Sequence, residues 1–557
     1  MKHRFTVLVL LIILTSSLLG GLLGSNVSAG SAPAQNSPND FLREFTEAID
    51  TIQKTHVDNV GADQLIYSAI KGMLRVLDPH SSFFDPKEFK RLREEQHSKY
   101  FGLGIRVRTL LRGDRGKVVV VEPPSINSPA QRRGLRAGDV ISKIAGESID
   151  DWTQDLVVDH LRGPRGTTVE ITVERPGIRT PIQFKVERDE IPIITVPYAF
   201  EVKPGVGYVK IDRFSESTAD ELREKLDKLG ANKLSGLILD LRDNPGGLLN
   251  QAIDVTDFFV RKNALIVSTQ GRMQGSSHKY TAPSVDKVQV PLVVLINKHS
   301  ASASEIVAGA LQDHDRALIA GETSFGKGLV QSVYTMDSST GLALTTARYY
   351  TPSGRLIQRD YSGSAFDYYN LPDAPGNSTS REKRTTDSGR QVLGGGGITP
   401  DVTVPLRELN RFEALLNAKD IFFEYARRLA SGQVPAGSNF QLPVKKDEVK
   451  GAPARDDAAS AIAKLEITDA LLEDFKEFIR SRKVEFTGQD INDNIDFIKR
   501  RIKQEIFISS FGLQEGFRVA VQGDTQVQKA LEMMPEAKTL MTTGRLTPVE
   551  QSLEIKK

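Results

Sequence analysis

Cysteine is absent from this 557-residue chain, and several other features are missing with it. Without cysteine there is no disulfide framework, no thiol nucleophile and no lipid-modified cysteine, so a lipoprotein anchor is excluded. The eight histidines are scattered, with no His-Glu-x-x-His or comparable grouping, so we expect no metal and no cofactor. The net charge is only +2, which gives no reason to expect a nucleic-acid partner.

What remains is the composition of an ordinary soluble protein. Hydrophobic residues make up 39% of the chain and charged residues 26%. At about 150 residues per domain, the length suggests roughly three or four domains with a sizeable core.

The N-terminus has the pattern of an export signal. Basic residues 2–4 precede an apolar stretch over residues 5–23, and Val27-Ser-Ala29 offers a small-x-small cleavage site. We therefore expect a signal peptide over residues 1–29 and a periplasmic or cell-envelope location. Because the apolar run is long for a signal peptide, an uncleaved anchor that tethers the protein to the inner membrane is the alternative. Residues 30–40 are rich in Ser, Ala, Pro and Asn, which is typical of a linker.

Changes in pattern divide the rest of the chain into four parts. Residues 41–98 have apolar side chains at helical spacing and predict an N-terminal helical segment. Residues 99–187 are predicted to form a compact β-rich unit. Residues 188–405 alternate strand-like runs, among them 265–268, with helical runs, among them 218–229, which favours an α/β core. Within that core, residues 360–390 are polar and predict a surface insertion. Residues 406–557 are helical and charged, and we expect them to serve packing or homodimer formation.

The β-rich unit contains two specific glycine motifs, Gly102-Leu103-Gly104-Ile105 and Gly134-Leu-Arg-Ala-Gly-Asp139. Their order among the predicted strands resembles a PDZ domain. That resemblance implies that the backbone N–H groups of the first motif bind a peptide's terminal carboxylate while the peptide adds a strand to the sheet. The alternative is that the glycines only supply turn geometry.

A serine-rich turn is the sharpest chemical signal. An apolar run over residues 291–296 predicts a buried strand, and Ser300-Ala-Ser302-Ala-Ser304-Glu305 follows it before a helical pattern. A hydroxyl in this turn would lie at the positive end of a helix, where backbone N–H groups can stabilise an oxyanion. The alternative is structural, because Ser302 and Glu305 have the spacing of a capping box.

A glycine-flanked lysine, Lys327, lies 25 residues after Ser302. The motif that begins at Gly321 matches a phosphate-binding loop except that Gly328 replaces Ser or Thr, and a strand pattern instead of a helix follows, so ATP binding is not expected. In an extended segment Lys327 and Gln331 share one face, so the glutamine can orient the amine. To act as a base, the lysine must be desolvated enough to lower its pKa from ~10.4 by ~3 units.

A third motif, Asp240-Leu-Arg-Asp-Asn-Pro-Gly-Gly-Leu248, follows a predicted buried strand. Its consecutive glycines allow close backbone approach and leave N–H groups for an oxyanion, although a plain strand-to-helix turn would have the same composition.

A Ser-His-Asp hydrolase is the alternative interpretation of the serine-rich turn. It would use His299 or His314 with Asp313 or Asp315, but no Gly-x-Ser-x-Gly elbow surrounds Ser302.

Together the motifs resemble the carboxyl-terminal processing peptidases, or tail-specific proteases. The resemblance runs from about residue 57 to residue 404 and includes Leu77-Asp-Pro-His-Ser-Ser-Phe83 and Gly394-Gly-Gly-Gly-Ile-Thr-Pro-Asp401. It implies a multidomain α/β fold with an inserted PDZ domain. It also implies an endopeptidase that binds the C-terminal tails of protein or peptide substrates and cleaves upstream; a catalytically inactive PDZ scaffold of the cell envelope is the alternative.

The resemblance also assigns roles by position. Ser302 becomes the nucleophile, with Ser300 and Ser304 as supporting residues, Lys327 becomes the general base and Gln331 the residue that orients it. The N–H groups of Ala303 and Gly247 would form the oxyanion hole. This chain has Pro245 where the family commonly has a glycine, which leaves Gly246 as an alternative to Gly247.

Overall fold

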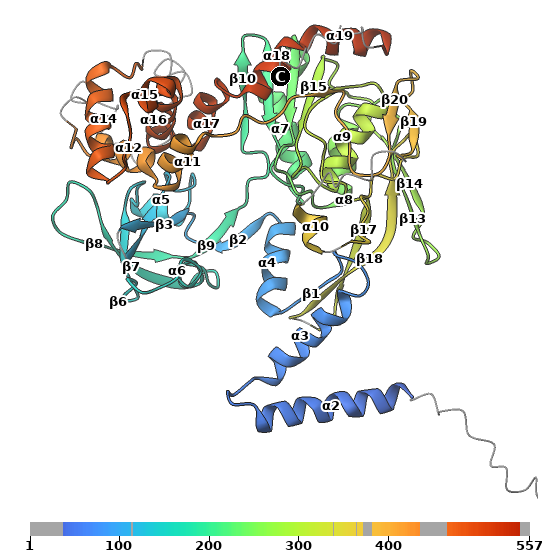
Figure 1. The fold of residues 1–557 in the computed structure, drawn as a ribbon, viewed down its shortest axis with the longest axis horizontal. Helices are drawn as coiled ribbons and strands as arrows, with labels where there is room; N and C mark the ends of the chain where they lie inside the picture. The colour runs from blue at the N-terminus through green and yellow to red at the C-terminus, as the bar shows by residue number, and fades with distance from the viewer. Residues whose placement is uncertain are drawn as a thin grey trace, which may run out of the picture. The chain divides into compact units, whose positions relative to one another are not determined.

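The computed structural model describes residues 37–112, 115–337, 339–363, 365–370, 381–434 and 465–545 (Figure 1). The chain divides into two compact units, residues 1–77 and 78–557. The predicted signal segment and most of the predicted linker lie outside the described residues. Within the described ranges, no helix has the length and apolar character needed to span a membrane.

In the first unit, the described residues form two helices, α2 (Pro38–Thr55) and α3 (Ala62–Leu74), as the periodicity predicted. The predicted linker boundary at residue 40 is wrong. Ser37 occupies the N-cap position of α2 and Pro38 the first helical position, so the helix begins three residues before that boundary. Proline fits there because its missing N–H has no helical partner at this position.

The second unit is built around a six-stranded sheet. Its strands run β10-β11-β12-β15-β16-β21, parallel from β11 to β21, with β10 antiparallel at one edge. Their bounds are Tyr198–Lys203, Val206–Lys210, Gly236–Asp240, Leu292–Ile296, Leu318–Gly321 and Val402–Thr403. All five residues of β12 and of β15 are buried, which explains their continuous apolar sequences.

Helices cover both faces of this sheet. One face packs with α7 (Thr218–Leu229), α8 (Leu249–Asp257) and α9 (Ala303–Asp313) in the largest apolar cluster. The other face packs with residues of the C-terminal helices α17 (Leu513–Val521), α18 (Thr525–Glu532) and α19 (Met534–Thr543). Helices α17, α18 and α19 are therefore part of the core of this unit. Homodimer formation by the C-terminal region stays a prediction.

A second sheet, whose paired strands are all antiparallel, is separate from the first. We predicted residues 265–268 as a strand of the α/β core, but β13 pairs with β14 and β18 of this second sheet. β17 pairs with β18 as well, so a strand does follow Lys327. The strands are β1 (Ser82–Phe84), β13 (Leu265–Gly271), β14 (His278–Thr281), β17 (Leu329–Thr335) and β18 (Gly341–Tyr350).

The β-rich unit has its own sheet and core, with β3 at the sheet edge. The chain enters and leaves it through a short antiparallel pair, β2 with β9. Helix α4 (Pro86–Gln96) precedes the unit and α6 (Gln154–Leu161) lies within it. The strands are β2 (Lys99–Gly102), β3 (Val107–Arg112), β4 (Arg115–Val120), β5 (Val140–Ile144), β6 (Glu147–Ser148), β7 (Thr168–Glu174), β8 (Ile182–Glu187) and β9 (Asp189–Pro192).

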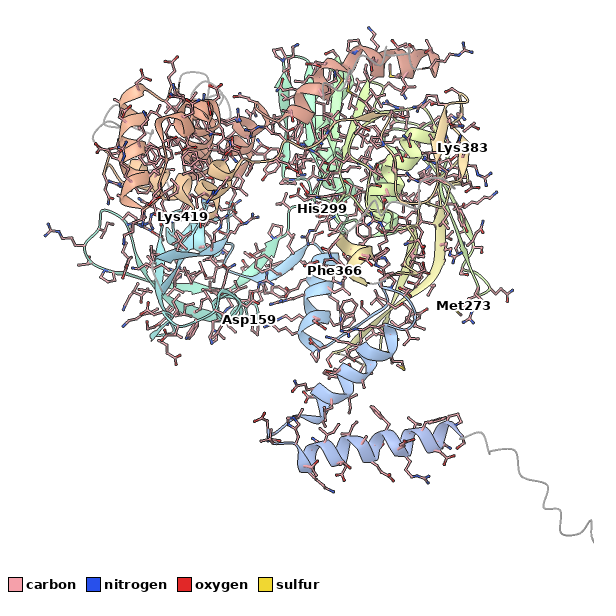
Figure 2. All side chains as sticks on the ribbon, in the orientation of Figure 1. Asp159, Met273, His299, Phe366, Lys383 and Lys419 are labelled. Atoms are coloured by element: carbon pink, nitrogen blue, oxygen red, sulfur yellow. The ribbon has the colours of Figure 1, made fainter. Side chains whose placement is uncertain are left out.

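Two further segments belong to the second compact unit, residues 78–557. Helices α11 (Arg411–Ala418), α12 (Ile421–Ala430), α14 (Asp469–Ser481), α15 (Gly488–Asp493) and α16 (Ile495–Phe511) share an apolar core. The predicted surface insertion at 360–390 contains the short helix α10 (Ala365–Asn370), on which Figure 2 labels Phe366. Phe366 is exposed, whereas Tyr368 of the same helix is buried, so α10 lies at the surface and packs one aromatic side chain into the interior.

Candidate active site

The three serines of the turn differ in what their hydroxyls do. Ser300 Oγ donates to the carbonyl of Leu241 at 2.8 Å, and Ser304 Oγ donates to the carbonyl of Asn244 at 3.0 Å. Both are fully buried, whereas Ser302 lines a pocket. Ser302 has φ 55° and ψ −112°, an unfavourable backbone conformation for serine, and α9 begins at the next residue. The turn therefore presents one hydroxyl, at a helix N-terminus.

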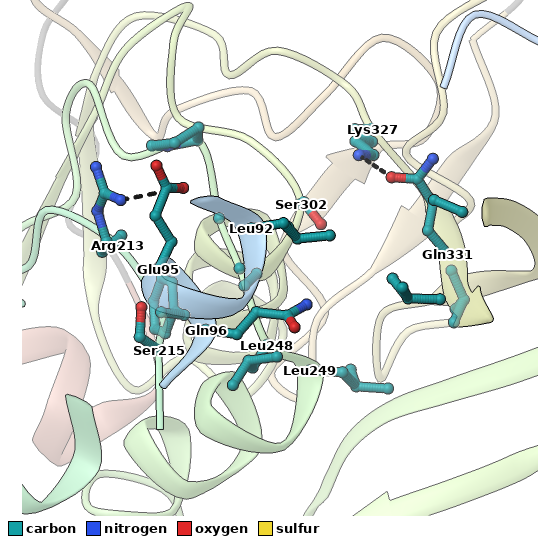
Figure 3. Close-up of a pocket in the computed structure, with 18 of the residues that line it drawn as sticks. Leu92, Glu95, Gln96, Arg213, Ser215, Leu248, Leu249, Ser302, Lys327 and Gln331 are labelled. Carbon is teal, nitrogen blue, oxygen red and sulfur yellow. Dashed lines mark hydrogen bonds and ion pairs between the residues drawn. The ribbon is translucent and has the colours of Figure 1, made fainter. Parts of the chain in front are cut away.

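Lys327 and Gln331 meet as their spacing predicted. Lys327 Nζ donates to Gln331 Oε1 at 2.7 Å, and Figure 3 shows the two side chains pointing toward each other. Burial lowers the pKa of Lys327, although the charges of Glu305 and Asp78 oppose that shift. Ser302 and Lys327 line the same pocket. Among the described residues no hydrogen bond joins their side chains, and such bonds often tighten only in the substrate complex.

Glu305 connects the serine turn to the lysine loop. Its fully buried carboxylate accepts hydrogen bonds from the N–H groups of Ser302 at 2.8 Å, Gly326 at 2.7 Å and Lys327 at 2.9 Å, and from Ser324 Oγ at 2.5 Å. Burial raises its pKa to about 7, and the four hydrogen bonds oppose the rise. The capping-box spacing identified this residue, but only as a helix cap. Its contacts with the lysine loop depend on tertiary structure.

The glycine pair of the third motif lies against the serine turn. The N–H of Gly246 donates to Asn244 Oδ1 at 2.9 Å, whereas neither Gly247 nor Ala303 donates its N–H to another described residue. Gly246 has φ 100°, and a Cβ there would lie 2.8 Å from the Cβ of Ser302, so a side chain would displace the serine. The geometry thus leaves the N–H of Gly247, and not that of Gly246, available near Ser302.

The pocket beside Ser302 has a volume of about 370 Å³ and a mixed lining. Glu95 of α4 and Arg213 form an ion pair of 3.3 Å across one side, which Figure 3 shows with a dashed line. Much of the remaining lining is apolar and consists of Phe84, Leu92, Leu248, Leu249, Ile306, Leu329, Val330, Val333 and Ala343. Such a lining suits an apolar side chain of a bound peptide.

The rival histidine arrangement does not form. His314 caps the C-terminal end of α9, about 16 Å along the helix from its N-terminus at 1.5 Å per residue, and contacts Asp387. Asp313 binds Arg355, and Asp315 binds Arg390. Among the described residues no histidine is hydrogen-bonded to Ser302, and the exposed His299, labelled in Figure 2, is no exception.

The first glycine motif of the β-rich unit forms the loop between β2 and β3. Gly104 has φ 77°, and the carbonyls of Leu103 and Gly104 accept hydrogen bonds from Ala130 and Ser125. Among the described residues, no acceptor contacts the N–H groups of Leu103, Gly104 or Ile105, whereas Gly102 belongs to β2. The loop therefore directs three N–H donors away from the protein's own acceptors.

The edge strand β3, which follows this loop, has one outward N–H that is already bonded. The N–H of Thr109 donates to the side-chain oxygen of Gln154, the first residue of α6, at 3.0 Å. A peptide that added a strand here would have to displace that side chain.

Comparison with known proteins identifies the family. The model of peptidase family S41 matches residues 205–370, and the PDZ domain model matches residues 92–174. The carboxy-terminal-processing protease of Bartonella bacilliformis is 42% identical over 339 residues, which cover 60% of this chain and 76% of that protein. The chain belongs to the carboxy-terminal-processing proteases of peptidase family S41.

A second sequence match agrees with this assignment. The carboxy-terminal processing protease CtpB of Bacillus subtilis is 34% identical over 333 residues, 59% of this chain and 68% of that protein. The solved structure of a photosystem II D1 C-terminal processing protease is 28% identical and covers 66% of this chain and 94% of that chain, with a TM-score of 0.34. Because that score is low, membership in this protease family rests on the sequence matches.

Proposed function

We propose that this S41 protease is a serine endopeptidase in which Ser302 attacks the peptide bond and Lys327 is the general base. The observation that carries the proposal is that one pocket brings together a serine at a helix N-terminus, a partly buried lysine with a lowered pKa, and the N–H of Gly247, which donates to no acceptor among the described residues. Gln331 holds the lysine amine by its side-chain oxygen. A lysine with these surroundings can be neutral at a pH where an exposed lysine is charged.

The reaction is an acyl transfer in two halves. The neutral amine of Lys327 takes the proton of Ser302 Oγ as that oxygen bonds to the peptide carbonyl carbon, and the oxyanion accepts hydrogen bonds from the N–H groups of Gly247 and Ala303. The lysine then gives its proton to the leaving amine. The lysine, neutral again, takes a proton from a water molecule as that water attacks the acyl-enzyme, and it returns the proton to Ser302 Oγ as the second product leaves.

Substitution of the two residues tests this mechanism. We expect Ser302→Ala and Lys327→Ala each to lower kcat for an internally quenched peptide by at least about a thousandfold while the fold is retained. Lys298→Ala removes an exposed lysine near the same turn and should leave kcat unchanged. Wild-type activity in Lys327→Ala would contradict the assigned base.

We also propose that the PDZ domain captures the substrate's C-terminal tail. The three N–H donors of Leu103, Gly104 and Ile105 suit a terminal carboxylate, and the adjoining strand β3 is a sheet edge. Amidation of the peptide's C-terminus removes the anion, so we expect amidation to raise KM about tenfold or more. Equal KM values for acid and amide would rule out carboxylate recognition.

Export of the protein is a further part of the proposal. The basic, apolar and small-residue pattern of residues 1–29 supports it, although these residues lie outside the described structure. N-terminal sequencing of the protein recovered from cell envelopes distinguishes a cleaved signal, which would give a new N-terminus near residue 30, from an anchor that retains Met1.

A further inference from the structure

Gln331 holds Lys327, and a loop at the start of the second unit in turn holds Gln331. The side-chain Nε2 of Gln331 donates a hydrogen bond to the backbone carbonyl of His80. An amide side chain has an acceptor end and a donor end, so this contact fixes which end faces the amine. Oε1 accepts from Lys327 because Nε2 is engaged by His80.

The imidazole of His80 extends these contacts to α10. Its Nε2 lies 2.7 Å from the hydroxyl of Tyr368, and that hydroxyl also accepts a hydrogen bond from Gln358 Nε2 at 3.1 Å. Gln358 Oε1 accepts from the N–H of Gly328 at 2.8 Å. Because Gly328 follows Lys327, the hydrogen bonds form a closed circuit that starts and ends at the lysine. We call these side chains and the Gly328 N–H the Lys327 network.

We infer that His80, Tyr368 and Gln358 are positioning residues that hold Gln331, and through it the Lys327 amine, in the orientation needed to accept the serine proton. The inference rests on the proposed Ser-Lys mechanism. None of the three lines the described pocket, so they act on the reaction only through Gln331 and the lysine loop.

The loop that carries His80 is anchored to the strand opposite Gln331. Asp78 Oδ1 accepts hydrogen bonds from the N–H groups of His80 and Ser81, both at 2.8 Å, and from Thr345 Oγ1 at 3.1 Å. Thr345 of β18 is the cross-strand neighbour of Gln331. The same point of the sheet therefore sets the position of the glutamine and of the carbonyl that orients it.

The protonation states of the network suit a lysine that works as a base. Burial and the charge of Lys327 lower the pKa of His80 to about 4, with Asp78 opposing, so the imidazole is neutral near neutral pH. Burial raises the pKa of Tyr368 to about 12, so its hydroxyl keeps its proton. That hydroxyl accepts from Gln358 and can donate to a neutral His80 Nε2. The network thus adds no charge that would compete with the amine for a proton.

Aromatic packing allows the hydrogen bonds to be removed without removing the rings. Phe325 packs edge-on against His80 and Tyr368, with ring centres 6.5 Å and 5.6 Å apart. The guanidinium of Arg359 lies over Phe325 at 4.3 Å. A phenylalanine at position 368 keeps these apolar contacts and loses only the hydroxyl.

The first experiment measures kcat and KM of Tyr368→Phe with an internally quenched peptide that has a free apolar C-terminus. We expect kcat to fall about tenfold or more, because the substitution removes both hydrogen bonds of the hydroxyl, the one with His80 and the one from Gln358, while KM stays within about twofold of wild type. Tyr334→Phe removes a hydroxyl from a 43% exposed tyrosine on β17 and should change neither constant.

The second experiment compares two replacements of His80. His80→Gln can place an amide near the position of Nε2 and should restore most of the activity, whereas His80→Phe should lose about tenfold in kcat. The double variant His80→Phe/Tyr368→Phe should lose no more than the worse single variant, because both changes break the same circuit.

Lys327→Ala, assayed in parallel, distinguishes a failure of the positioning role from a failure of the Ser-Lys mechanism. If Lys327→Ala is inactive but Tyr368→Phe and His80→Phe keep wild-type kcat, the positioning role is wrong and the Ser-Lys mechanism stands. A rise in KM at constant kcat, or equal losses in His80→Gln and His80→Phe, also overturns the positioning role. If Lys327→Ala is fully active, the mechanism itself fails.

Discussion

Helix α9 has buried carboxylates at both ends, and the carboxylates at the two ends have different kinds of partner. Near the N-terminus, Glu305 accepts four hydrogen bonds from neutral donors, and no ion pair with it occurs among the described residues. At the C-terminus, Asp313 pairs with the fully buried Arg355, and Asp315 just beyond pairs with Arg390. Among the described residues, the carboxylate at the N-terminal end forms no ion pair, whereas the two at the C-terminal end are each paired with an arginine.

This difference between the partners suggests that the N-terminal end of α9 serves the reaction and the C-terminal end serves the stability of the fold. Cations at the C-terminal end complement the helix dipole and compensate the buried acids. At the other end burial raises the pKa of Glu305 to about 7, and Ser302 has an unfavourable φ of 55°. Unfavourable conformations and shifted pKa values of this kind are found where a protein orients reacting groups. We therefore expect changes at the N-terminal end to reduce activity and changes at the C-terminal end to reduce stability.

The largest effect should come from breaking the C-terminal pair. Arg355→Met leaves Asp313 buried without its cation, and we expect the free energy of unfolding to fall by about 3–5 kcal/mol. Chemical denaturation measures this loss, with the exposed Arg261→Met as the control. If Arg355→Met is as stable as the control, the C-terminal end does not serve stability as argued.

Glu305→Gln should lower activity more than it lowers stability. The amide retains one oxygen but places an NH₂ group against donors that now bond a carboxylate oxygen, so the serine turn and lysine loop shift relative to each other. A displacement of about 1 Å can lower the rate about a hundredfold, and we expect that loss in kcat. Thermal unfolding in parallel should show a smaller loss of stability than in Arg355→Met. A variant that loses stability but keeps kcat would remove the functional role of Glu305.

The pH dependence of the free energy of unfolding tests whether the Glu305 carboxyl at the N-terminal end of α9 titrates near neutral pH. The folded state holds the Glu305 proton to a pKa of about 7, against an ordinary value of 4.5. The folded state thus binds more protons than the unfolded state in this window, and the stability contributed at low pH is lost as pH rises. We expect this group to reduce the free energy of unfolding by about 2 kcal/mol between pH 5 and pH 7.

Glu305→Gln isolates that contribution, because His80 and other groups titrate equally in both proteins. Denaturation at pH 5 and pH 7 should show a smaller decrease in the variant than in the wild type. Identical decreases would mean that the carboxyl is ionised throughout this range.

The smallest effect should follow from His314→Gln at the C-terminal end. The ring nitrogens of His314 face two acceptors, Asp387 Oδ2 at 2.9 Å and the carbonyl oxygen of Leu265 at 2.7 Å, and Asp387 is partly exposed. We therefore expect a loss of about 1 kcal/mol or less in stability. Since this histidine lies at the far end of α9 from Ser302, kcat should stay within about twofold of wild type. A large loss of kcat would revive the Ser-His-Asp alternative.

Sequence patterns predicted the local elements well. The buried strand before the serines, the strand after Lys327 and the helix of residues 218–229 are confirmed because each has a strong apolar period or run. The pattern could not tell which sheet a strand joins. Residues 265–268 were predicted as a strand of the α/β core but belong to the second sheet, because strand pairing depends on partners far apart in the chain.

Part of the candidate site was also accessible from sequence. The spacing of Lys327 and Gln331 predicted their contact, and the family resemblance selected Ser302. The roles of Ser302, Lys327, Gln331, Gly247, Ala303 and the PDZ loop from Gly102 to Ile105 remain proposals. His80 lies in the motif of residues 77–83, but that motif did not predict its contact with Tyr368, because the two residues are 288 positions apart and meet only in the folded chain.

The sequence alone determined the protease family, the order of its parts and the chemical types at the candidate site, because these depend on residues that are close together in the chain. Tertiary structure decided which hydroxyl of Ser300, Ser302 and Ser304 faces the pocket, and that the N–H of Gly247 and not of Gly246 is available. Both outcomes depend on which hydrogen-bond acceptors the fold brings close from distant parts of the chain. A hydroxyl or N–H group is available for chemistry only when the fold has given it no other partner.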